Sequence, residues 1–284
     1  MIKIKTYIKI LITLSQRFLR YIYDLILIVI YSIKNLLLTG KFYEENIIFV
    51  TAAEKNYFSQ VNSLLESYTK NNNSKLLLYN IGLQYEQKIE LTEKYSDIEI
   101  RDFDFSKYPS FIGEYFDNKL GNYAWKPIII DELLNEFKSK VVWLDAGNII
   151  NKKIVFLKVA LTAKKIIVPK SSNRIIDWTH NKTIEYIGLD SKHFRKNNYA
   201  SGLIGFDYKS DIAKKISEEW KRFSMIQECI APKGSSRGNH RQDQAVLTIL
   251  LYKYLFFNIF AKMTYPKTNF ILGVLFHKKR IFDF

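Results

Sequence analysis

The stretch Lys140-Val-Val-Trp-Leu-Asp-Ala-Gly-Asn148 is a short apolar run that ends abruptly in a carboxylate and a turn. A run of this length, nearly continuous in apolar residues, is typical of a strand that is buried on both faces. In sheets of parallel strands, ligands bind beyond the carboxyl ends of the strands. The sequence therefore places Asp145 where a ligand is expected. The alternative is a strand-terminal Asp that caps a turn in which Gly147 supplies a positive φ.

Strand and helix patterns alternate on both sides of this run. Short apolar runs predict strands over residues 46–53, 75–80 and 97–105, and helical spacing predicts helices over residues 57–70, 84–95, 123–137 and 245–254. This alternation predicts an α/β fold with a mostly parallel central sheet and helices on both faces, over residues 44–284. The strand ends direct attention to Thr51–Ala53, Asp102–Asp104 and Asp145–Asn148 as possible ligand contacts.

The composition excludes several classes of protein. The 284 residues are 48% hydrophobic, which is enough for a packed core and excludes a disordered chain. A single cysteine, Cys229, excludes a disulfide scaffold or a Cys-rich zinc module. The net charge of +15 suits phosphates, anionic lipid or nucleic acid, although a Lys-rich and Asn-rich composition can also reflect an AT-rich genome. No glycine-rich dinucleotide motif, P-loop motif or Gly-x-Ser-x-Gly elbow occurs.

Residues 1–43 differ from the rest of the chain. This segment contains one acid, Asp24, and the cations Lys3, Lys5, Lys9, Arg17, Arg20, Lys34 and Lys41. Its longest uncharged apolar run, Leu25–Ile33, is shorter than the ~18–20 residues that a spanning helix needs. At about 100° per residue, most of its polar side chains share one narrow arc of a helix, and apolar side chains cover the remainder.

This pattern predicts an N-terminal amphipathic helix that lies on an anionic membrane surface, with Lys and Arg reaching the headgroups. The expected location is cytoplasmic, at the inner face of the membrane. Two alternatives are a helix that packs on the domain or on a second copy of the chain, and a bitopic signal-anchor.

Three segments carry the chemistry. The first, Asn122-Tyr-Ala-Trp-Lys-Pro-Ile-Ile-Ile130, leads into the strand before Asp145; the second is Tyr199-Ala-Ser-Gly-Leu-Ile-Gly-Phe206, and the third is His240-Arg-Gln-Asp-Gln-Ala-Val-Leu247. Their order resembles that of glycosyltransferases of the GT-A type, which have a Rossmann-like nucleotide-sugar-binding fold. The nearest resemblance is to glycogenin-like and lipopolysaccharide-galactosyltransferase-like families and to related uncharacterised bacterial transferases. It extends from Asn46 to Arg280, although only the three segments are specific.

The resemblance implies a metal site at Asp145. In such transferases an Asp-x-Asp motif holds a divalent cation against the sugar diphosphate, and Asp145 matches the first Asp. The implied cofactor is Mn²⁺ or Mg²⁺, which prefer oxygen ligands. The second Asp position is Gly147 here, which puts that cofactor in doubt. His277 and Lys278 match late residues that reach the metal and the diphosphate, and His277 could compensate for the missing carboxylate; a solvated basic tail is the alternative.

The same resemblance implies the residues that contact sugar and nucleotide. Trp125 and Lys126 would lie beside the nucleotide, and Ser201 and Gly202 would let the donor sugar approach the backbone. Thr51 is expected at the substrate site from the position of its strand end. For Trp125 and Lys126, the alternative is a core tryptophan beside a solvated lysine. For Gly202, it is an ordinary glycine at the start of a strand.

Asp243 and Gln244 are the implied catalytic pair. In an inverting enzyme Asp243 would be the general base toward the acceptor hydroxyl; in a retaining enzyme either residue would support the developing oxocarbenium ion. The alternative is an N-cap of the following helix. His180, His193 and His240 have no ligand spacing and are expected at the surface or at helix starts.

The sequence thus predicts a transferase that moves a sugar from a nucleotide-sugar donor to a glycan or glycolipid acceptor of a capsule, lipopolysaccharide or similar surface polysaccharide. A non-catalytic basic protein that binds membrane or nucleic acid is the alternative, and an inactive transferase-like scaffold is a third. Nucleic acid is not expected as a partner, because the cations of the middle of the chain are dispersed among acids.

Overall fold

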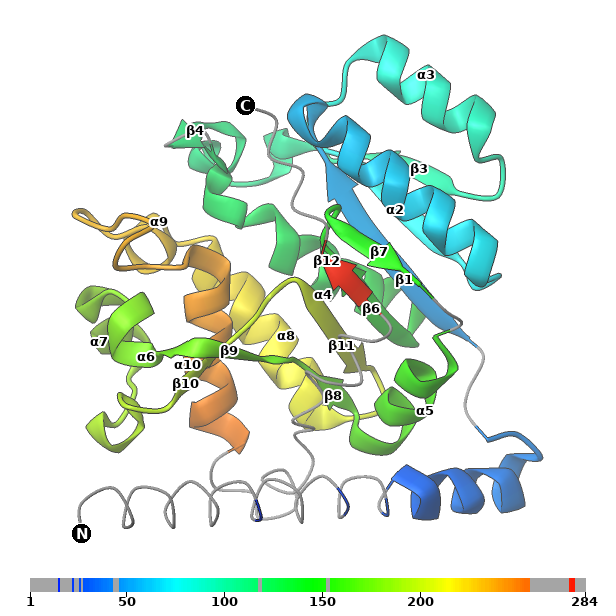
Figure 1. The fold of residues 1–284 in the computed structure, drawn as a ribbon. Coiled ribbons are helices and arrows are strands. Elements are labelled where there is room, and N and C mark those ends of the chain that lie inside the picture. The colour runs from blue at the N-terminus through cyan, green and yellow to red at the C-terminus, as the bar shows by residue number, and fades with distance from the viewer. Residues whose placement is uncertain are drawn as a thin grey trace, which may run out of the picture.

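A parallel sheet with one reversed strand forms the centre of the molecule (Figure 1). The computed structural model describes residues 15, 22, 26, 28–42, 46–116, 119–151, 154–255 and 276–278. Within them the main sheet has the order β3-β2-β1-β6-β11-β8, made of β1 (Ile47–Ala53), β2 (Leu76–Asn80), β3 (Glu99–Asp102), β6 (Lys140–Leu144), β8 (Ile166–Ile167) and β11 (Leu203–Asp207). The first four strands in this order run parallel, and β11 is antiparallel to β6 and β8. The predicted mostly parallel sheet is confirmed.

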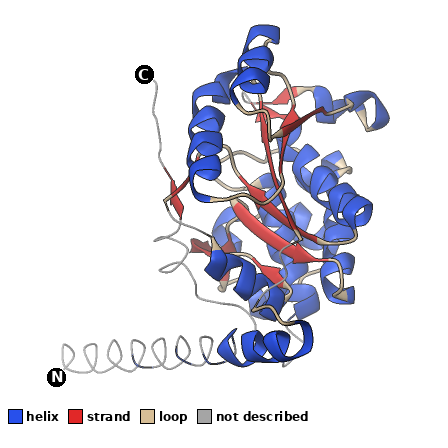
Figure 2. Ribbon diagram, turned by 90° about the vertical axis from the view of Figure 1, so that its right-hand side faces the viewer, coloured by secondary structure: helices blue, strands red, loops and turns tan. Residues whose placement is uncertain are grey.

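Helices cover both faces of this sheet (Figure 2). The long helices are α2 (Phe58–Asn71), α3 (Tyr85–Lys94), α4 (Trp125–Phe137), α5 (Val155–Lys164), α8 (Asp211–Ser224) and α10 (Gln242–Leu255). Val141 and Trp143 of β6 pack with α4, α8 and α10 in one apolar cluster, while Val142 and Leu144 pack with α2 and α5 in the other. Because both sets of alternate side chains are buried, the strand reads as a continuous apolar run in the sequence.

Shorter elements complete the chain. They are β4 (Tyr115–Phe116), β5 (Lys119–Leu120), β7 (Asn148–Ile150), β9 (Lys170–Arg174), β10 (Asn197–Tyr199), β12 (Phe276–Lys278), α6 (Ile175–Trp178), α7 (Asn181–Ile187) and α9 (Gln227–Ile230), with single 3₁₀ turns at Lys55–Tyr57, Phe105–Lys107, Ser110–Gly113, Gly121–Tyr123 and Ser191–His193. Strand β12 pairs antiparallel with β7, so that His277 lies opposite Ile149 and Lys278 opposite Asn148. A segment from the end of the sequence therefore returns to the strand that follows Asp145.

An unusual turn sets the direction of α4. Gly121, Asn122 and Tyr123 all have positive φ angles, of 52°, 49° and 65°. A Cβ atom at Gly121 would lie 2.2 Å from the carbonyl oxygen of Ile112, so only glycine fits there. Asn tolerates this left-handed region, whereas Tyr rarely adopts it. The helix consequently begins at Trp125, two residues later than the spacing predicts.

Most of the predicted N-terminal helix lies outside the described residues. Residues 28–39 are helical, and Ile28 is buried, but the large apolar side chains Val29, Ile30, Ile33, Leu37 and Leu38 are exposed. In the described part of the chain, no helix combines the length and the apolar character that crossing a membrane requires.

Candidate functional site

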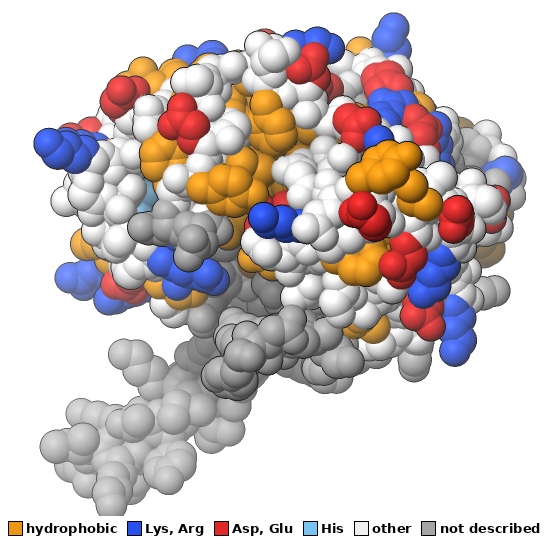
Figure 3. Space-filling model, turned by 90° about the horizontal axis from the view of Figure 1, so that it is seen from above, with side chains coloured by type: hydrophobic (Ala, Val, Ile, Leu, Met, Phe, Trp, Pro, Cys, Tyr) orange, Lys and Arg blue, Asp and Glu red, His pale blue; other side chains and the backbone are white. Residues whose placement is uncertain are grey.

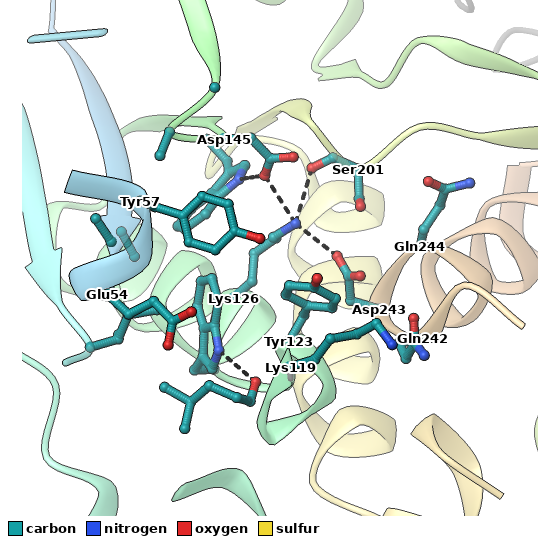
Figure 4. A pocket seen from close by; sticks show the side chains of 18 of the residues that line it. Glu54, Tyr57, Lys119, Tyr123, Lys126, Asp145, Ser201, Gln242, Asp243 and Gln244 are labelled. Carbon is teal, nitrogen blue, oxygen red and sulfur yellow. Dashed lines mark hydrogen bonds and ion pairs between the residues drawn. The ribbon is translucent and has the colours of Figure 1, made fainter. Parts of the chain in front are cut away.

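A cavity of about 460 Å³ opens at the carboxyl ends of β1 and β6 (Figure 4). Glu54 follows β1 and Asp145 follows β6, so both side chains enter the cavity from the sheet. The N-terminal turn of α4 contributes Lys126, and the N-terminal turn of α10 contributes Asp243 and Gln244. The cavity therefore lies where parallel sheets bind their ligands, and its volume is within the range of small-molecule sites.

The ammonium group of Lys126 joins the two sides of the cavity. Its Nζ lies 3.1 Å from Oδ1 of Asp145 and 3.0 Å from Oδ2 of Asp243. The Lys126 and Asp243 side chains are each 5% exposed, whereas the Asp145 side chain is 31% exposed. The rings of Tyr123 and Trp143 lie 5.7 and 5.5 Å from the same nitrogen, close enough for cation–π attraction. One buried cation is thus held by two carboxylates and two aromatic rings.

Burial and charge act in opposite directions on this group of residues. Burial alone would lower the pKa of Lys126, but the carboxylates of Asp145 and Asp243 raise that pKa above its ordinary value. Burial raises the pKa of Asp243, and the neighbouring Lys126 ammonium limits the rise. The lysine therefore stays charged, and its ammonium opposes the protonation that burial of Asp243 favours.

Hydrogen bonds that involve Trp143 and Gly202 fix the position of Asp145. The indole Nε1–H of Trp143 donates to Oδ1 of Asp145 at 2.8 Å, and the backbone N–H of Asp145 donates to the carbonyl of Gly202 at 3.0 Å. The Asn148 amide also donates to the Gly202 carbonyl, at 2.8 Å. A Cβ atom at Gly202 would lie 3.1 Å from Oδ2 of Asp145, so a larger residue would crowd the carboxylate.

The alternative of a left-handed turn at Gly147 is wrong. The φ of Gly147 is not positive, and a Cβ atom there would meet nothing within 4 Å. Glycine is therefore not required at this position for backbone reasons. Because Gly147 also lines the cavity, its side-chain position is open space beside Asp145.

Asp243 does not act as a helix cap. No hydrogen bond joins its carboxylate to a backbone N–H among the described residues, and its side chain is directed at Lys126 instead. The neighbouring Gln244 has a solvent-inaccessible Nε2 without a hydrogen-bond partner in the described structure, and Nε of Arg241 and Oε1 of Gln60 are in the same condition. Gln60, Arg241 and Gln244 all line the cavity. Leaving such groups unpaired costs about 1–3 kcal/mol each, so we expect water or a polar ligand to pair with them.

The structure brings together six of the residues that the sequence predicts. The cavity is lined by Trp125, Lys126, Asp145, Ser201, Asp243 and Gln244. Gly202 lies beside the carboxylate of Asp145. Trp125 donates its Nε1–H to the carbonyl of Leu120 and packs against Trp143. Thr51, in contrast, is fully buried within β1 and does not line the cavity. The residues of that strand end that do so are Ala52, Ala53 and Glu54, because the strand extends further than Thr51.

His277 and Lys278 are placed only by their backbone. The register of β12 puts them opposite Ile149 and Asn148, at the strand that follows Asp145. The other histidines are not surface residues as a group: His193 and His240 are buried, and His180 begins α7. The ring of His240 contacts the carbonyl of Ile230 and the backbone of His180, and burial lowers its pKa to about 4.

Several lining residues are missed by the sequence reasoning. Glu54, whose carboxylate accepts from the Tyr115 hydroxyl, and Tyr57 follow β1. Lys119, Arg237 and Arg241 bring cations to the cavity. The rule on strand ends would find Glu54 if it were applied one residue beyond the predicted strand end at Ala53. The cations carry no such signal, because they lie in a hairpin and in the loop before α10.

The described residues do not fit a divalent cation. They contain no group of three His, Cys, Asp or Glu side chains that could hold a metal ion. Gly147 supplies no carboxylate, and Oδ1 of Asp145 already contacts the Trp143 indole and the Lys126 ammonium. A cation at Asp145 would also be repelled by that ammonium.

The buried ion pairs give a pH-dependent prediction. In Lys126→Met, the Asp243 carboxylate stays buried without its cation, which we expect to lower the free energy of unfolding at pH 7 by about 3–5 kcal/mol. The pKa of Asp243, already raised by burial, should rise further. A carboxyl group with a raised folded-state pKa loses stability as pH rises from its unfolded value of about 3.9 through the folded value. The loss should therefore be smaller at pH 4 than at pH 7, measured by urea denaturation.

Lys119→Met, which removes a cation that forms no ion pair with a described carboxylate, is the matched control and should change stability little at either pH. An equal loss in Lys126→Met at both pH values would contradict the assigned role of Asp243.

Comparison with known proteins gives a family of unknown function and several solved structures. A family model described as a protein of unknown function (DUF1647) matches residues 21–131, which is less than half of the chain. No curated protein matches the chain. The galactosyltransferase LgtC, solved with donor and acceptor sugar analogues, is 17% identical over 72% of this chain and 70% of LgtC, with a TM-score of 0.44. Core-mannan synthase A of Aspergillus fumigatus, in a Mn/GDP form, is 8% identical over 72% and 69% of the two chains, with a TM-score of 0.49.

The bifunctional glycosyltransferase WbbM matches with a TM-score of 0.50 and 15% identity, over 75% of this chain. This chain spans 38% of the length of WbbM. At this level of identity the match concerns the fold. The resemblance read from the three segments is confirmed at that level: the chain has the GT-A fold found in glycosyltransferases.

Proposed function

We propose that this protein is a glycosyltransferase that moves a sugar from a nucleotide-sugar donor to a hydroxyl group of a glycan or glycolipid. The observation that carries the proposal is the Asp145–Lys126–Asp243 arrangement at the carboxyl ends of β1 and β6, in a cavity whose wall holds unpaired polar groups. These groups can pair with water or with a ligand, and a sugar offers many hydroxyls.

The donor is proposed to lie across the cavity, with its sugar near α10. The Asp243 carboxylate can accept hydrogen bonds from sugar hydroxyls, and the Gln244 amide can donate one. The ion pairs with Lys126 fix the orientation of both carboxylates relative to the proposed position of the sugar. The negative charge that develops on the leaving diphosphate would be met by Lys119, Arg237 and Arg241 of the cavity wall.

Asp243 has two possible uses in the transfer step, and both depend on its charge. As a base it would take the proton of the acceptor hydroxyl, for which a pKa raised by burial is favourable. As a fixed anion it would stabilise the positive charge on the sugar ring in the transition state. The ammonium of Lys126, 3.0 Å from Oδ2 of Asp243, favours the ionised carboxylate in either case.

The acceptor is proposed to be part of a surface polysaccharide or glycolipid, reached at the inner face of a membrane. The helical residues 28–39 expose Val29, Ile30, Ile33, Leu37 and Leu38, and Leu37 is 80% exposed. Lys34 lies in the same helix, and Lys41 follows its end. Exposed apolar side chains beside cations suit an anionic lipid surface.

A nucleic-acid-binding role finds no comparable support. On the face seen in Figure 3, Lys and Arg side chains are interspersed with Asp and Glu side chains and do not form one basic surface. A protein that binds nucleic acid concentrates its cations on one face or along one groove.

The experiment that tests the proposal is a panel of nucleotide sugars and nucleoside diphosphates, measured by thermal shift on the full chain. A ligand that binds the native state raises the melting temperature by mass action. The proposal predicts a shift with at least one nucleotide sugar and slow release of free sugar from it. No shift with any member of the panel would overturn the proposal.

The proposed catalytic pair, Asp243 and Gln244, gives a second prediction, in which a variant loses transfer activity without losing stability. Gln244→Leu removes a buried amide that has no partner, so the melting temperature should stay the same or rise, while transfer should fall by about 10²-fold. Asp243→Asn should lower transfer by roughly 10²–10⁴-fold and also lower the melting temperature, because Lys126 loses a carboxylate. Transfer with the best donor of the panel is the measurement.

Gln227→Leu, at an exposed position on α9, is the control for the change in chemistry and should leave transfer intact. If Gln244→Leu lowers stability and leaves transfer unchanged, the amide is structural and has a partner in solution.

The membrane contact gives a third prediction. The double variant Ile33→Glu with Leu37→Glu should weaken binding of the full chain to phosphatidylglycerol vesicles by at least about 10-fold, because burying each such side chain contributes about 1.5–3 kcal/mol. The charge-matched control places Glu at the exposed positions Thr92 and Ser96 of the α3 region, and should bind as the wild type does. Equal flotation of both double variants with the vesicles would contradict the proposed surface.

A further inference from the structure

The site contains its own cation. Lys126 Nζ lies 3.1 Å from Asp145 and 3.0 Å from Asp243, so one ammonium occupies the position between the carboxylate that ends β6 and the carboxylate that begins α10. In the GT-A resemblance, a divalent cation is expected beside the first of these carboxylates. Here the positive charge at that carboxylate is covalently part of the protein.

Among the side chains that the structure describes, few could serve as ligands of a divalent cation beside Asp145. Asp145 Oδ1 accepts from the Trp143 indole at 2.8 Å and lies 3.1 Å from Lys126 Nζ, and a Cβ atom at Gly202 would lie 3.1 Å from Oδ2. The next position that could offer a carboxylate is Gly147. Its Cβ direction is open and its backbone has an ordinary φ, so sterics do not explain the lack of a second acid.

Cations for a diphosphate are present elsewhere on the wall. Lys119, Arg237 and Arg241 line the cavity, and none of them forms an ion pair with a carboxylate among the described residues. Arg241 stacks on Trp178 with its Cζ 4.2 Å from the ring centre. Burial and then the charge of Arg237 lower the pKa of Arg241, and both residues line the same cavity. Neighbouring like charges of this kind are stabilised by a bound anion, and guanidinium groups match phosphate geometry.

We infer that this site binds the diphosphate of its donor without a divalent cation: Lys126 takes the place of the metal at Asp145, and Arg237 and Arg241 contact the phosphates. The inference rests on the proposed function and specifies its cofactor requirement.

The first test measures metal and nucleotide separately on the wild-type full chain. Free Mn²⁺ is followed by electron paramagnetic resonance as protein is added, with and without UDP or GDP, and binding of UDP and GDP is measured by calorimetry in EDTA and in Mn²⁺. Without nucleotide, we expect the Mn²⁺ signal to stay that of the free ion; with UDP or GDP, it should equal the signal of the same Mn²⁺–nucleotide mixture without protein. The affinity of the nucleotide that binds, corrected for the Mn²⁺–nucleotide complex in solution, should agree within about 2-fold in the two buffers.

The second test builds the missing carboxylate. Gly147→Asp places an acid two residues after Asp145, where no atom obstructs its Cβ. This variant should bind Mn²⁺ and gain at least about 10-fold in nucleotide affinity when Mn²⁺ is present. Gly147→Asn has the same shape without the charge, and should gain much less. Adding Asp145→Asn to Gly147→Asp should abolish the new Mn²⁺ binding.

A third variant reports on the phosphate contacts. Arg237→Gln with Arg241→Gln should lower nucleotide affinity in EDTA by at least about 10-fold, whereas Lys233→Gln, in the same loop but not lining the cavity, should leave it unchanged.

The outcomes distinguish this inference from the proposed function. Stoichiometric Mn²⁺ binding by the wild type, or nucleotide binding that is lost in EDTA, overturns the metal-free site and leaves the transferase standing. Unchanged nucleotide affinity in the double arginine variant overturns the assigned phosphate contacts. Absence of nucleotide binding in both buffers overturns the proposed function, and the inference falls with it.

Discussion

Burying the ammonium of Lys126 has a cost in free energy that only nearby carboxylates can offset, and the surrounding structure follows from that requirement. The two carboxylates come from residues 145 and 243, which belong to the end of β6 and the start of α10. The ammonium comes from the first turn of α4, which is aimed by the left-handed turn at residues 121–123. Three elements far apart in the sequence must therefore meet at one point. A small displacement of any of them would leave a charge buried without a partner.

The same requirement separates two kinds of polar group in the cavity. Lys126, Asp145 and Asp243 satisfy one another, and they keep the site in a defined geometry before any ligand arrives. Gln244 and Arg241 retain polar atoms that are shielded from solvent and unpaired in the described structure. Such atoms lower the stability of the free protein and raise the affinity for a ligand that pairs with them. The fixed geometry of the three charged residues and the unpaired polar atoms of Gln244 and Arg241 are features of a site that is preorganised for a polar substrate.

Because Lys126 is part of the protein, the site has a permanent positive charge between its two carboxylates. A divalent cation can be lost to a chelator or exchanged, whereas an ammonium on the protein is always present at its two carboxylates. The proposed diphosphate contacts then depend on Arg237 and Arg241, which both lie in the loop before α10. If the N-terminal segment lies on a lipid surface, as proposed, a lipid-linked acceptor would be concentrated near the protein, and recognition of the acceptor would not need to rest on the cavity alone.

The sequence by itself determines the sheet and the main site residues, because both depend on local patterns. The apolar run of β6 and its terminal Asp145 identify a buried strand with a carboxylate at its end, and the resemblance carries Lys126, Asp243 and Gln244 to the same site. Only the tertiary structure decides which of these groups touch. It directs Asp243 to Lys126 and not to a helix cap, it keeps Thr51 inside its strand, and it shows that Gly147 is free of backbone constraint. It also brings Arg237 and Arg241 to the cavity. The physical reason is that burial, ion pairing and open space are relations between residues distant in the chain, and no local pattern of residue types encodes them.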